Sequence, residues 1–82
     1  MALNGTITHI SRSNGMFIVR IDEGDCVVFE LLDGIDLQVG QLVRGNLTGL
    51  GGETLTVVDD GTDFEAFGQS GPSSLNACLK LL

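Results

Sequence analysis

The chain has 82 residues, is 43% hydrophobic and carries a net charge of −7, from eleven acidic against four basic side chains. This length allows one domain with a single small core, and the hydrophobic share is that of a globular protein rather than a disordered chain. The acidic excess argues against nucleic acid as a partner, because proteins that bind it neutralise phosphates with Lys and Arg.

Other features of the composition argue against membrane, secreted and metal-binding classes. The sequence does not start with a charged segment followed by an apolar run, and it has no apolar run of about 18 residues that would span a bilayer. Its two cysteines, Cys26 and Cys78, are too few for a disulfide scaffold and lack the spacing of metal ligands. We therefore expect a cytoplasmic protein with free thiols, no metal, no cofactor and no membrane association.

Three β-rich runs open the chain. Val, Ile and Phe dominate Met16–Ile21 and Cys26–Leu32, and the polar turn between them contains Gly24, which is typical of a hairpin. Leu3–Ile10 predicts a further strand, joined through Asn14-Gly15, a dipeptide favoured in two-residue turns. These turns define a register. The predicted cross-strand pairs are Ile10 with Val19, His9 with Arg20, Ile21 with Cys26, and Val19 with Val28.

Alternation along these strands sorts their side chains into two faces. The face assigned to the core consists of Thr8, Ile10, Phe17, Val19, Ile21, Cys26 and Val28. The opposite face consists of Ile7, His9, Met16, Ile18, Arg20, Val27, Phe29 and Leu31. This second face is also mostly apolar, which a sheet with one side in water does not require. Either a later segment covers it, or it is a contact surface for a partner.

The middle of the chain combines glycine-rich turns with short apolar runs. Leu37–Gly40 predicts either one helical turn or an irregular link. Gln41–Thr48 predicts a strand with Val43 and Leu47 on one side, followed by a turn at Gly49–Gly52.

The last β-like segment, Leu55–Phe67, predicts a hairpin around Asp60-Gly61. A two-residue turn at this dipeptide places four apolar side chains on one face. The predicted pairs are Val57 with Phe64 and Leu55 with Ala66.

A short helix is expected at the end of the chain. After Gly71-Pro72, either Ser73 or Ser74 is suited to cap it. Its apolar stripe consists of Leu75, Cys78, Leu79 and Leu82. Because a helix of about eight residues is not stable alone in water, we expect it to dock on the spare apolar face of the first hairpin or on a neighbouring subunit.

Short strands, glycine-rich turns and one small helix predict an all-β fold, a small five- to six-stranded OB-like barrel with a short C-terminal helix. Closure of the barrel would remove the exposed edges of a small sheet. The predicted organisation is a single domain, 1–82, with a β-barrel over 1–70 and a C-terminal helical tail over 71–82.

Four motifs resemble the first half of the cold-shock domain family. They are GTITHIS at 5–11, NGMFIV at 14–19, DEG at 22–24 and LQVGQLV at 37–43. The family has G-x-V-K-W-F-N, K-G-F-G-F-I, D-D-G and L-x-x-G-Q-x-V at nearly the same spacing. The resemblance covers about residues 5–47 and implies an OB-type barrel of the kind that binds single-stranded nucleic acid.

The chain departs from this family at the functional positions. Cold-shock domains stack bases on aromatic side chains, whose faces accept any base. His9 stands at the family's tryptophan position, and Met16 and Ile18 replace two of its phenylalanines. Phe29 is the one aromatic residue left on that surface, and the lysine positions hold uncharged residues. The resemblance therefore supports the scaffold but not base stacking.

No combination of residues in the sequence supports catalysis or metal binding. His9 is the single histidine and has no cysteine or second histidine at ligand spacing. Asp59–Asp63 groups carboxylates around a glycine without the D-x-D-x-D-G spacing of a calcium loop, and we interpret it as a solvated hairpin tip.

These observations predict a non-enzymatic, OB-like barrel that acts as a protein-interaction module, with a protein partner or a second copy of the chain. The alternative is a single-stranded nucleic-acid-binding module of the cold-shock type. The predicted binding surface consists of His9, Met16, Ile18, Arg20, Val27 and Phe29.

Overall fold

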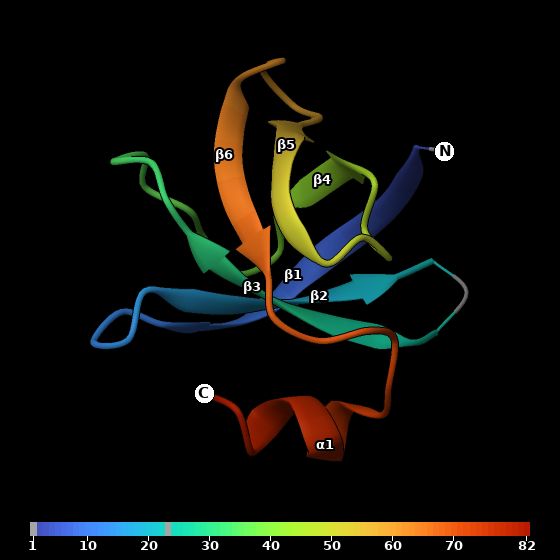
Figure 1. Cartoon of the computed structure of the whole chain (residues 1–82). Coiled ribbons are helices and arrows are strands. Elements are labelled where there is room, and N and C mark those ends of the chain that lie inside the picture. Colours follow the sequence, from blue (N-terminus) through green and yellow to red (C-terminus); the bar gives the residue numbers. More distant parts are fainter. Residues whose placement is uncertain (1, 23) are drawn as a thin grey trace.

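The computed structural model describes residues 2–22 and 24–82. Within them lie six β-strands and one short α-helix, coloured along the chain in Figure 1. The elements are β1 (Leu3–Ser11), β2 (Met16–Ile21), β3 (Cys26–Leu31), β4 (Leu42–Gly45), β5 (Gly51–Val57), β6 (Asp63–Gly68) and α1 (Leu75–Leu79).

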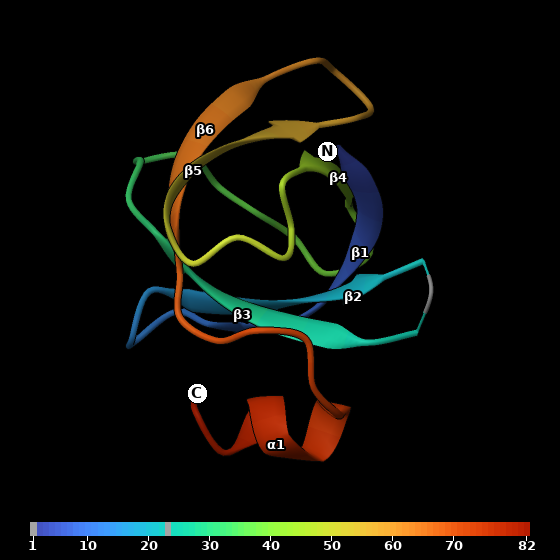
Figure 2. The ribbon, with the colours of Figure 1, turned by 45° about the vertical axis from the view of Figure 1, so that its right-hand side comes forward.

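The strands form a closed barrel in the order β1-β2-β3-β6-β5-β4, with β4 returning to β1. Every neighbouring pair is antiparallel. Two three-stranded meanders, β1–β3 and β4–β6, make up the ring that Figure 2 shows. The predicted fold class, an all-β barrel with a short C-terminal helix, is confirmed, and the barrel has six strands among the described residues.

The first hairpin has a longer turn than its Asn14-Gly15 dipeptide predicts. Ser11 pairs with Met16, so four residues form the loop, and Ile10 lies opposite Phe17 rather than Val19. A two-residue type I′ turn needs positive φ at both central positions. Among the described residues only glycines have positive φ, and Gly15 at 69° is the one in this loop. The predicted turn and its register are therefore wrong.

A β-bulge interrupts the pairing of β1 with β2. Ile7 pairs with Val19 and His9 pairs with Ile18, so that Thr8 is the extra residue. A bulge reverses the side-chain alternation beyond it. Ile7, which was assigned to the outer face, is therefore fully buried inside the barrel, while Ile10 also packs against the core.

The pairing of β2 with β3 is shifted by one residue from the prediction. Val19 lies opposite Val27, not Val28. Because the side-chain period of a strand is two, a one-residue shift exchanges its faces. Val27 and Phe29 therefore point into the barrel, and Cys26 and Val28 point outward, which corrects the predicted assignment of all four.

The pairing of β5 with β6 is shifted by two residues, which leaves the faces unchanged. Leu55 pairs with Phe64, and the last pair before the loop is Thr56 with Asp63, so the predicted two-residue turn is wrong. The prediction that four apolar residues share one face is confirmed, since all lie in the core. They are Leu55, Val57, Phe64 and Ala66.

Aromatic rings fill the middle of the barrel. The centroid of the Phe17 ring lies 5.9 Å from that of Phe29 and 6.1 Å from that of Phe64, the first pair stacked and the second tilted. The remaining buried residues of this core are Ile7, Val19, Ile21, Val27, Leu37, Val43, Leu47, Leu55, Val57 and Ala66. Val43 and Leu47 were predicted to lie on one side, and both are buried.

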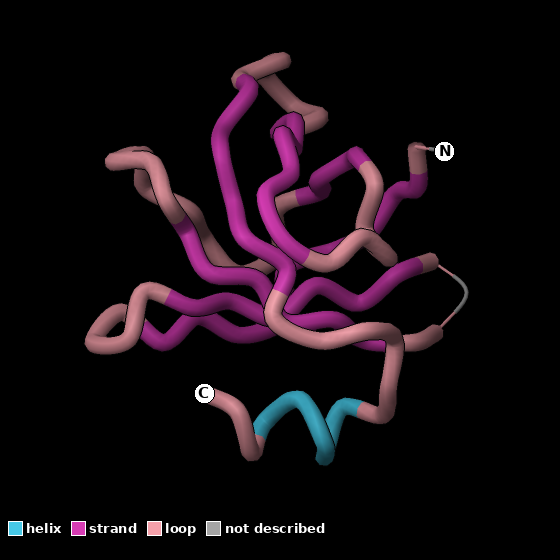
Figure 3. Tube along the Cα trace, viewed as in Figure 1, coloured by secondary structure: helices cyan, strands magenta, loops and turns pink. Residues whose placement is uncertain are grey.

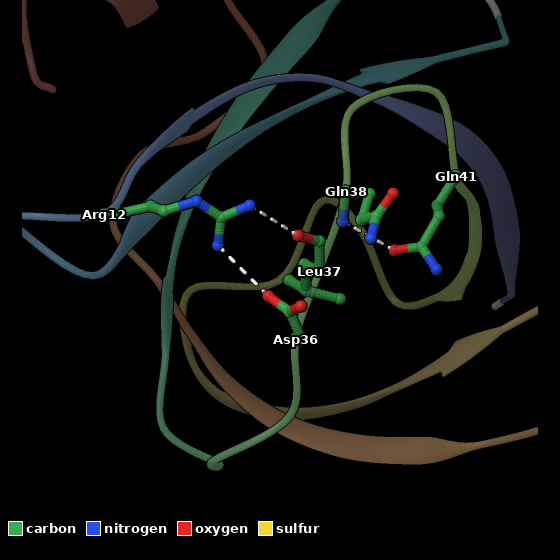
Figure 4. A network of polar contacts seen from close by, with 5 residues as sticks. All are labelled: Arg12, Asp36, Leu37, Gln38 and Gln41. Atoms are coloured by element: carbon green, nitrogen blue, oxygen red, sulfur yellow. Dashed lines mark hydrogen bonds and ion pairs between the residues drawn. The ribbon is translucent and has the colours of Figure 1, made fainter.

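An irregular link between β3 and β4 crosses one end of the barrel and buries Leu37. Figure 4 shows how the first loop holds this link. The Arg12 guanidinium donates to the Asp36 carboxylate and to the carbonyl of Leu37, both at 3.2 Å, and the Gln38 N–H donates to the side-chain oxygen of Gln41 at 2.8 Å. Of the two predicted alternatives for Leu37–Gly40, the irregular link is the one observed.

The segment after β6 leads along β3 to the helix, as the tube in Figure 3 shows. The Gln69 N–H donates to the Val28 carbonyl at 2.9 Å. Cys26 and Ser73 then exchange two backbone hydrogen bonds of 2.8 and 2.9 Å. These bonds bring the start of α1 to the outer side of the first hairpin.

Candidate interaction surfaces

The helix α1 covers the outer face of β2 and β3, below the barrel in Figure 1. Ser74 is its N-cap and accepts a hydrogen bond from the Ala77 N–H at 3.2 Å, which confirms one of the two predicted capping residues. Cys78 is the residue of α1 that is buried. The helix therefore docks on the first hairpin, which was one of the two predicted docking sites, the other being a neighbouring subunit.

A small apolar cluster joins the helix to the barrel, separate from the barrel core. Its buried members are Ile18, Cys26, Val28 and Cys78, with Met16 and Leu82 packed at its margin. Burial of this kind stabilises by about 25 cal/mol per Å² of apolar surface. We call the outer side of β2 and β3 the helix-covered face.

Three of the six predicted site residues lie on this face, and a fourth, His9, lies beside it on β1. Met16 and Ile18 contribute to the cluster under α1. His9 is paired with Ile18 beside it, and Arg20 is exposed at the other end of β2. The His9 ring Nδ1 lies 3.0 Å from the Thr8 hydroxyl, a half-buried contact between neighbours in the chain.

The other two predicted site residues, Val27 and Phe29, are fully buried in the barrel core and are not part of any surface. Sequence reasoning missed Cys26 and Val28, which take their place on the outside. The alternation within β3 was read correctly, but its phase depends on the turn before it, and no signal in β3 itself fixes that phase.

The two thiols of the chain meet at the helix-covered face. Cys26 is 3% exposed and Cys78 is fully buried, and both are free. Burial raises the pKa of the Cys26 thiol above its usual value, the neighbouring Cys78 adds to this effect, and Arg20 opposes it. The prediction that placed Cys26 in the barrel core, away from Cys78, is therefore wrong.

The outer side of β5 and β6 is open and carries three carboxylates, those of Asp33, Asp63 and Glu65. Its outward-facing residues, with the two that follow β3, are Leu32, Asp33, Gly52, Thr54, Thr56, Asp63, Glu65 and Phe67. We call it the acidic face. Thr54 donates its hydroxyl to Glu65 at 2.6 Å and Thr56 donates to Asp63 at 2.7 Å. These bonds fix the carboxylates across the two strands.

Two shallow hollows lie on the acidic face. One hollow of about 240 Å³ is lined by Leu32, Gly52, Glu53, Thr54, Glu65 and Ala66. A second, of about 150 Å³, is lined by Asp33, Thr54, Asp63, Phe64 and Glu65. The Asp33 carboxylate accepts the backbone N–H of Glu65 at 2.7 Å, which holds the loop after β3 against β6.

Phe67 is the aromatic side chain of the acidic face. It is 43% exposed, and its cross-strand neighbour on β5 is Gly52. A Cβ atom added to Gly52 would meet nothing within 4 Å, so the space beside the ring is open. The next residue, Gly68, lies so close to the carbonyl of Gly49 that no side chain would fit there. Leu50, the residue after Gly49, is also exposed.

The carboxylates of the acidic face are not neutralised by cations of the chain. Among the described residues, the ion pair present joins Arg12 to Asp36 at 3.2 Å, and both side chains are largely exposed. Arg44 on β4 pairs with Thr56 on β5, and Thr56 pairs with Asp63 on β6. One strand therefore separates the arginine from this carboxylate. This face thus combines exposed apolar groups with unpaired negative charge.

The described residues contain no group of three or more His, Cys, Asp or Glu side chains that could hold a metal ion. Within the same residues, no helix has the length and apolar character needed to cross a membrane. No protein-family model matches the chain, and no curated protein or solved structure is significantly similar to it.

Proposed function

We propose that this protein is a non-catalytic, OB-like barrel that binds a protein partner through its acidic face. The scaffold part of the proposal has two supports, the resemblance of residues 5–47 to cold-shock domains and the small closed antiparallel barrel. The choice of function rests on the surface and not on the fold, because one fold serves many functions.

The observation that carries the proposal is the open position of Phe67 next to Gly52. Aromatic side chains are enriched among the residues that dominate binding energies. Complete burial of a phenylalanine contributes about 1.5–3 kcal/mol. The glycine opposite gives a partner's side chain room to contact the ring.

The charge of this face sets the chemistry of the partner. Asp33, Asp63 and Glu65 lie on the same face as Phe67 without a neutralising cation, so a complementary surface carries Lys or Arg beside an apolar group. The net charge of −7 attracts such a partner at long range. It also opposes self-association through this face, because two copies would bring like charges together.

The alternative, a single-stranded nucleic-acid-binding module, has less support. OB-folds bind oligonucleotides across the face of strands 2 and 3, and in this chain α1 lies over that face. The acidic face would repel phosphates.

Peptide binding to the full chain tests the proposal. We would use an array of defined peptides that vary in basic and aromatic content, probed with the wild type, with Phe67→Ser and with Leu42→Ser. Leu42 is a matched control, because it is also 43% exposed on the outside of a strand but lies on β4. We expect basic apolar peptides to bind the wild type and Leu42→Ser, and to lose binding to Phe67→Ser and at raised salt.

Three outcomes would contradict the proposal. They are equal binding to both variants, a preference for acidic peptides, and no binding to any peptide. Titration with labelled single-stranded DNA and RNA at low salt decides on the alternative. Micromolar or tighter, salt-sensitive binding there would replace the protein-binding role with the cold-shock type.

A further inference from the structure

The two thiols under α1 occupy one small space between the helix and the barrel. Cys26 and Ser73 face each other as an antiparallel pair that exchanges two backbone hydrogen bonds. Directly opposed residues of such a pair project their side chains to the same side, with Cβ atoms about 4.5–5.5 Å apart. The Ser73 hydroxyl in turn lies 3.4 Å from the Cys78 sulfur. Ser73 therefore ties the position of one thiol to that of the other.

We propose that Cys26 and Cys78 form a redox-sensitive pair, and that its oxidation to a disulfide locks α1 onto the helix-covered face. The two residues are far apart in the sequence and belong to opposite sides of the interface, one to β3 and one to α1. A bond between them would close the chain across that interface. The inference concerns the contact between β3 and α1 and does not depend on the proposed function.

While the thiols are reduced, few interactions hold α1 on the barrel. A disulfide can therefore change how often the helix opens. Cys78 is its buried residue, and the exposed leucines Leu75 and Leu79 face solvent for a large part of their surface. A helix of this length does not persist without its docking contacts. Local opening that releases α1 therefore needs the loss of one small cluster and not of the barrel core. Once a disulfide has formed, that opening requires the bond to break.

The oxidation balances with hydrogen peroxide as the oxidant. One thiolate attacks the peroxide, so that an S–O bond forms, the O–O bond breaks and hydroxide leaves. The second thiolate attacks that sulfur, the S–S bond forms, the S–O bond breaks and a second hydroxide leaves. Protons from the two thiols convert both hydroxides to water. The two sulfurs lose two electrons in total, and the peroxide gains them.

The environment of the thiols makes this reaction depend on opening of the helix. Thiolates rather than thiols react, and burial raises the pKa of Cys26, with Cys78 adding to the effect and Arg20 opposing it. Both sulfurs are shielded from solvent while α1 is docked. Oxidation should therefore be slow in the closed state and faster in variants whose helix docks less tightly.

The test treats the full-length reduced chain with hydrogen peroxide and maps the products by mass spectrometry. We expect an intramolecular Cys26–Cys78 bond that dithiothreitol reverses. We also expect a higher Tm and exchange of the Cys78 amide, which donates to the Ser74 carbonyl at 3.1 Å, slowed by about tenfold or more. The variants Cys26→Ala and Cys78→Ala keep a small apolar group at each position and should show neither change on treatment.

Several results would overturn the inference. One is oxidation to sulfinic or sulfonic acid without an internal disulfide, and another is a disulfide between two chains. A third is thiols that stay reduced while amide exchange shows that α1 opens. A disulfide that leaves the exchange of the α1 amides unchanged would also overturn it, because the bond would then not lock the helix. Exchange is measured on the wild type before and after treatment, so the test does not depend on the folding of a variant.

Discussion

The two outer faces of the barrel differ in what each needs from the rest of the chain. On the helix-covered face, Ile18 and Val28 point outward, and the chain provides a helix to bury them. On the acidic face, the outward positions of β5 and β6 hold polar residues such as Thr54, Asp63 and Glu65. Neighbouring hydroxyls and solvent can provide their hydrogen bonds, as the Thr54 hydroxyl does for Glu65. An apolar outer face must be covered or used as an interface. The first face is completed by the chain itself, and the second is left available.

The comparison also explains why so short a helix exists. Five residues do not form a stable helix on their own. The cluster around Cys78 provides the docking energy, and the Ser74 cap and the backbone pairing of Ser73 with Cys26 set the position. The helix therefore depends on the face that it covers, and the apolar side chains of that face are shielded from water only while the helix is docked.

The largest effect on the free energy of unfolding is expected for an inward-facing phenylalanine, with an outward-facing one as its comparison. Phe29→Ser removes a ring stacked on Phe17 in the barrel core and should cost about 3–5 kcal/mol in the free energy of unfolding. Phe67→Ser, on the neighbouring strand but facing outward, should change it by less than about 1 kcal/mol. Urea denaturation of both variants measures the difference. Equal costs would show that the register of β3 is wrong.

A smaller effect is expected from a charge placed under the helix. Val28→Asp buries a carboxylate without a partner, but release of α1 lets water reach it, so the cost should be limited to about 2–3 kcal/mol. The NMR signals of α1 should lose their dispersion while those of the barrel keep it. Val58→Asp is the matched control, because Val58 is 45% exposed and should tolerate the change within about 0.5 kcal/mol. Loss of barrel signals in Val28→Asp would contradict the separation of the two clusters.

The helix cap should have a moderate, local effect. Ser74→Ala removes the acceptor of the Ala77 N–H and should weaken α1 by about 0.5–2 kcal/mol. The measurement is amide exchange in α1 together with the rate at which Cys78 is labelled by a maleimide. Ser13→Ala, in the exposed first loop, is the control. Labelling that is no faster in Ser74→Ala than in Ser13→Ala would mean that helix release does not limit access to the thiol.

The smallest effect concerns the tip of the hairpin beside the acidic face. The Thr62 backbone N–H donates to the Asp60 carboxylate at 2.9 Å and lowers the pKa of that carboxyl below its ordinary value of 3.8. Folding therefore favours the charged form. The resulting contribution to stability is present above pH 3.8 and is lost as the pH falls through the lower folded value. Asp60→Asn should remove this part of the acid sensitivity, and an NMR titration of Asp60 with a midpoint at or above 3.8 would contradict it.

Elements could be predicted from local pattern, and registers could not. The strands, the Ser74 cap and the docking of the helix depend on short-range alternation and on capping chemistry. Registers depend on the turns, and here Asn14-Gly15 and Asp60-Gly61 both stand inside longer loops. The bulge at Thr8 has no recognisable signature in its residues. Neither the loop lengths nor the bulge is encoded by the dipeptides that suggested two-residue turns.

Whether an error in register changes the predicted surface depends on the number of residues in the shift. An odd shift exchanges the two faces of a strand, and an even shift keeps them. The shift of one residue in β3 moved Val27 and Phe29 from the predicted surface to the core. The shift of two residues in β6 kept Phe64 inside and Phe67 outside. Alternation in DFEAF therefore already contained the outward Phe67 of the acidic face. Its neighbour Gly52 could not be inferred, because the predicted register would have placed Thr54 beside the ring.

Closure of the barrel limits how a partner can recognise this protein. In the described chain, each of the six strands pairs on both sides, so no strand has an edge that is unpaired along its whole length. The barrel therefore has no complete edge strand of the kind that β-augmentation extends in PDZ domains. A partner therefore has to contact side chains, and the choice of partner will change with substitutions such as Phe67→Ser.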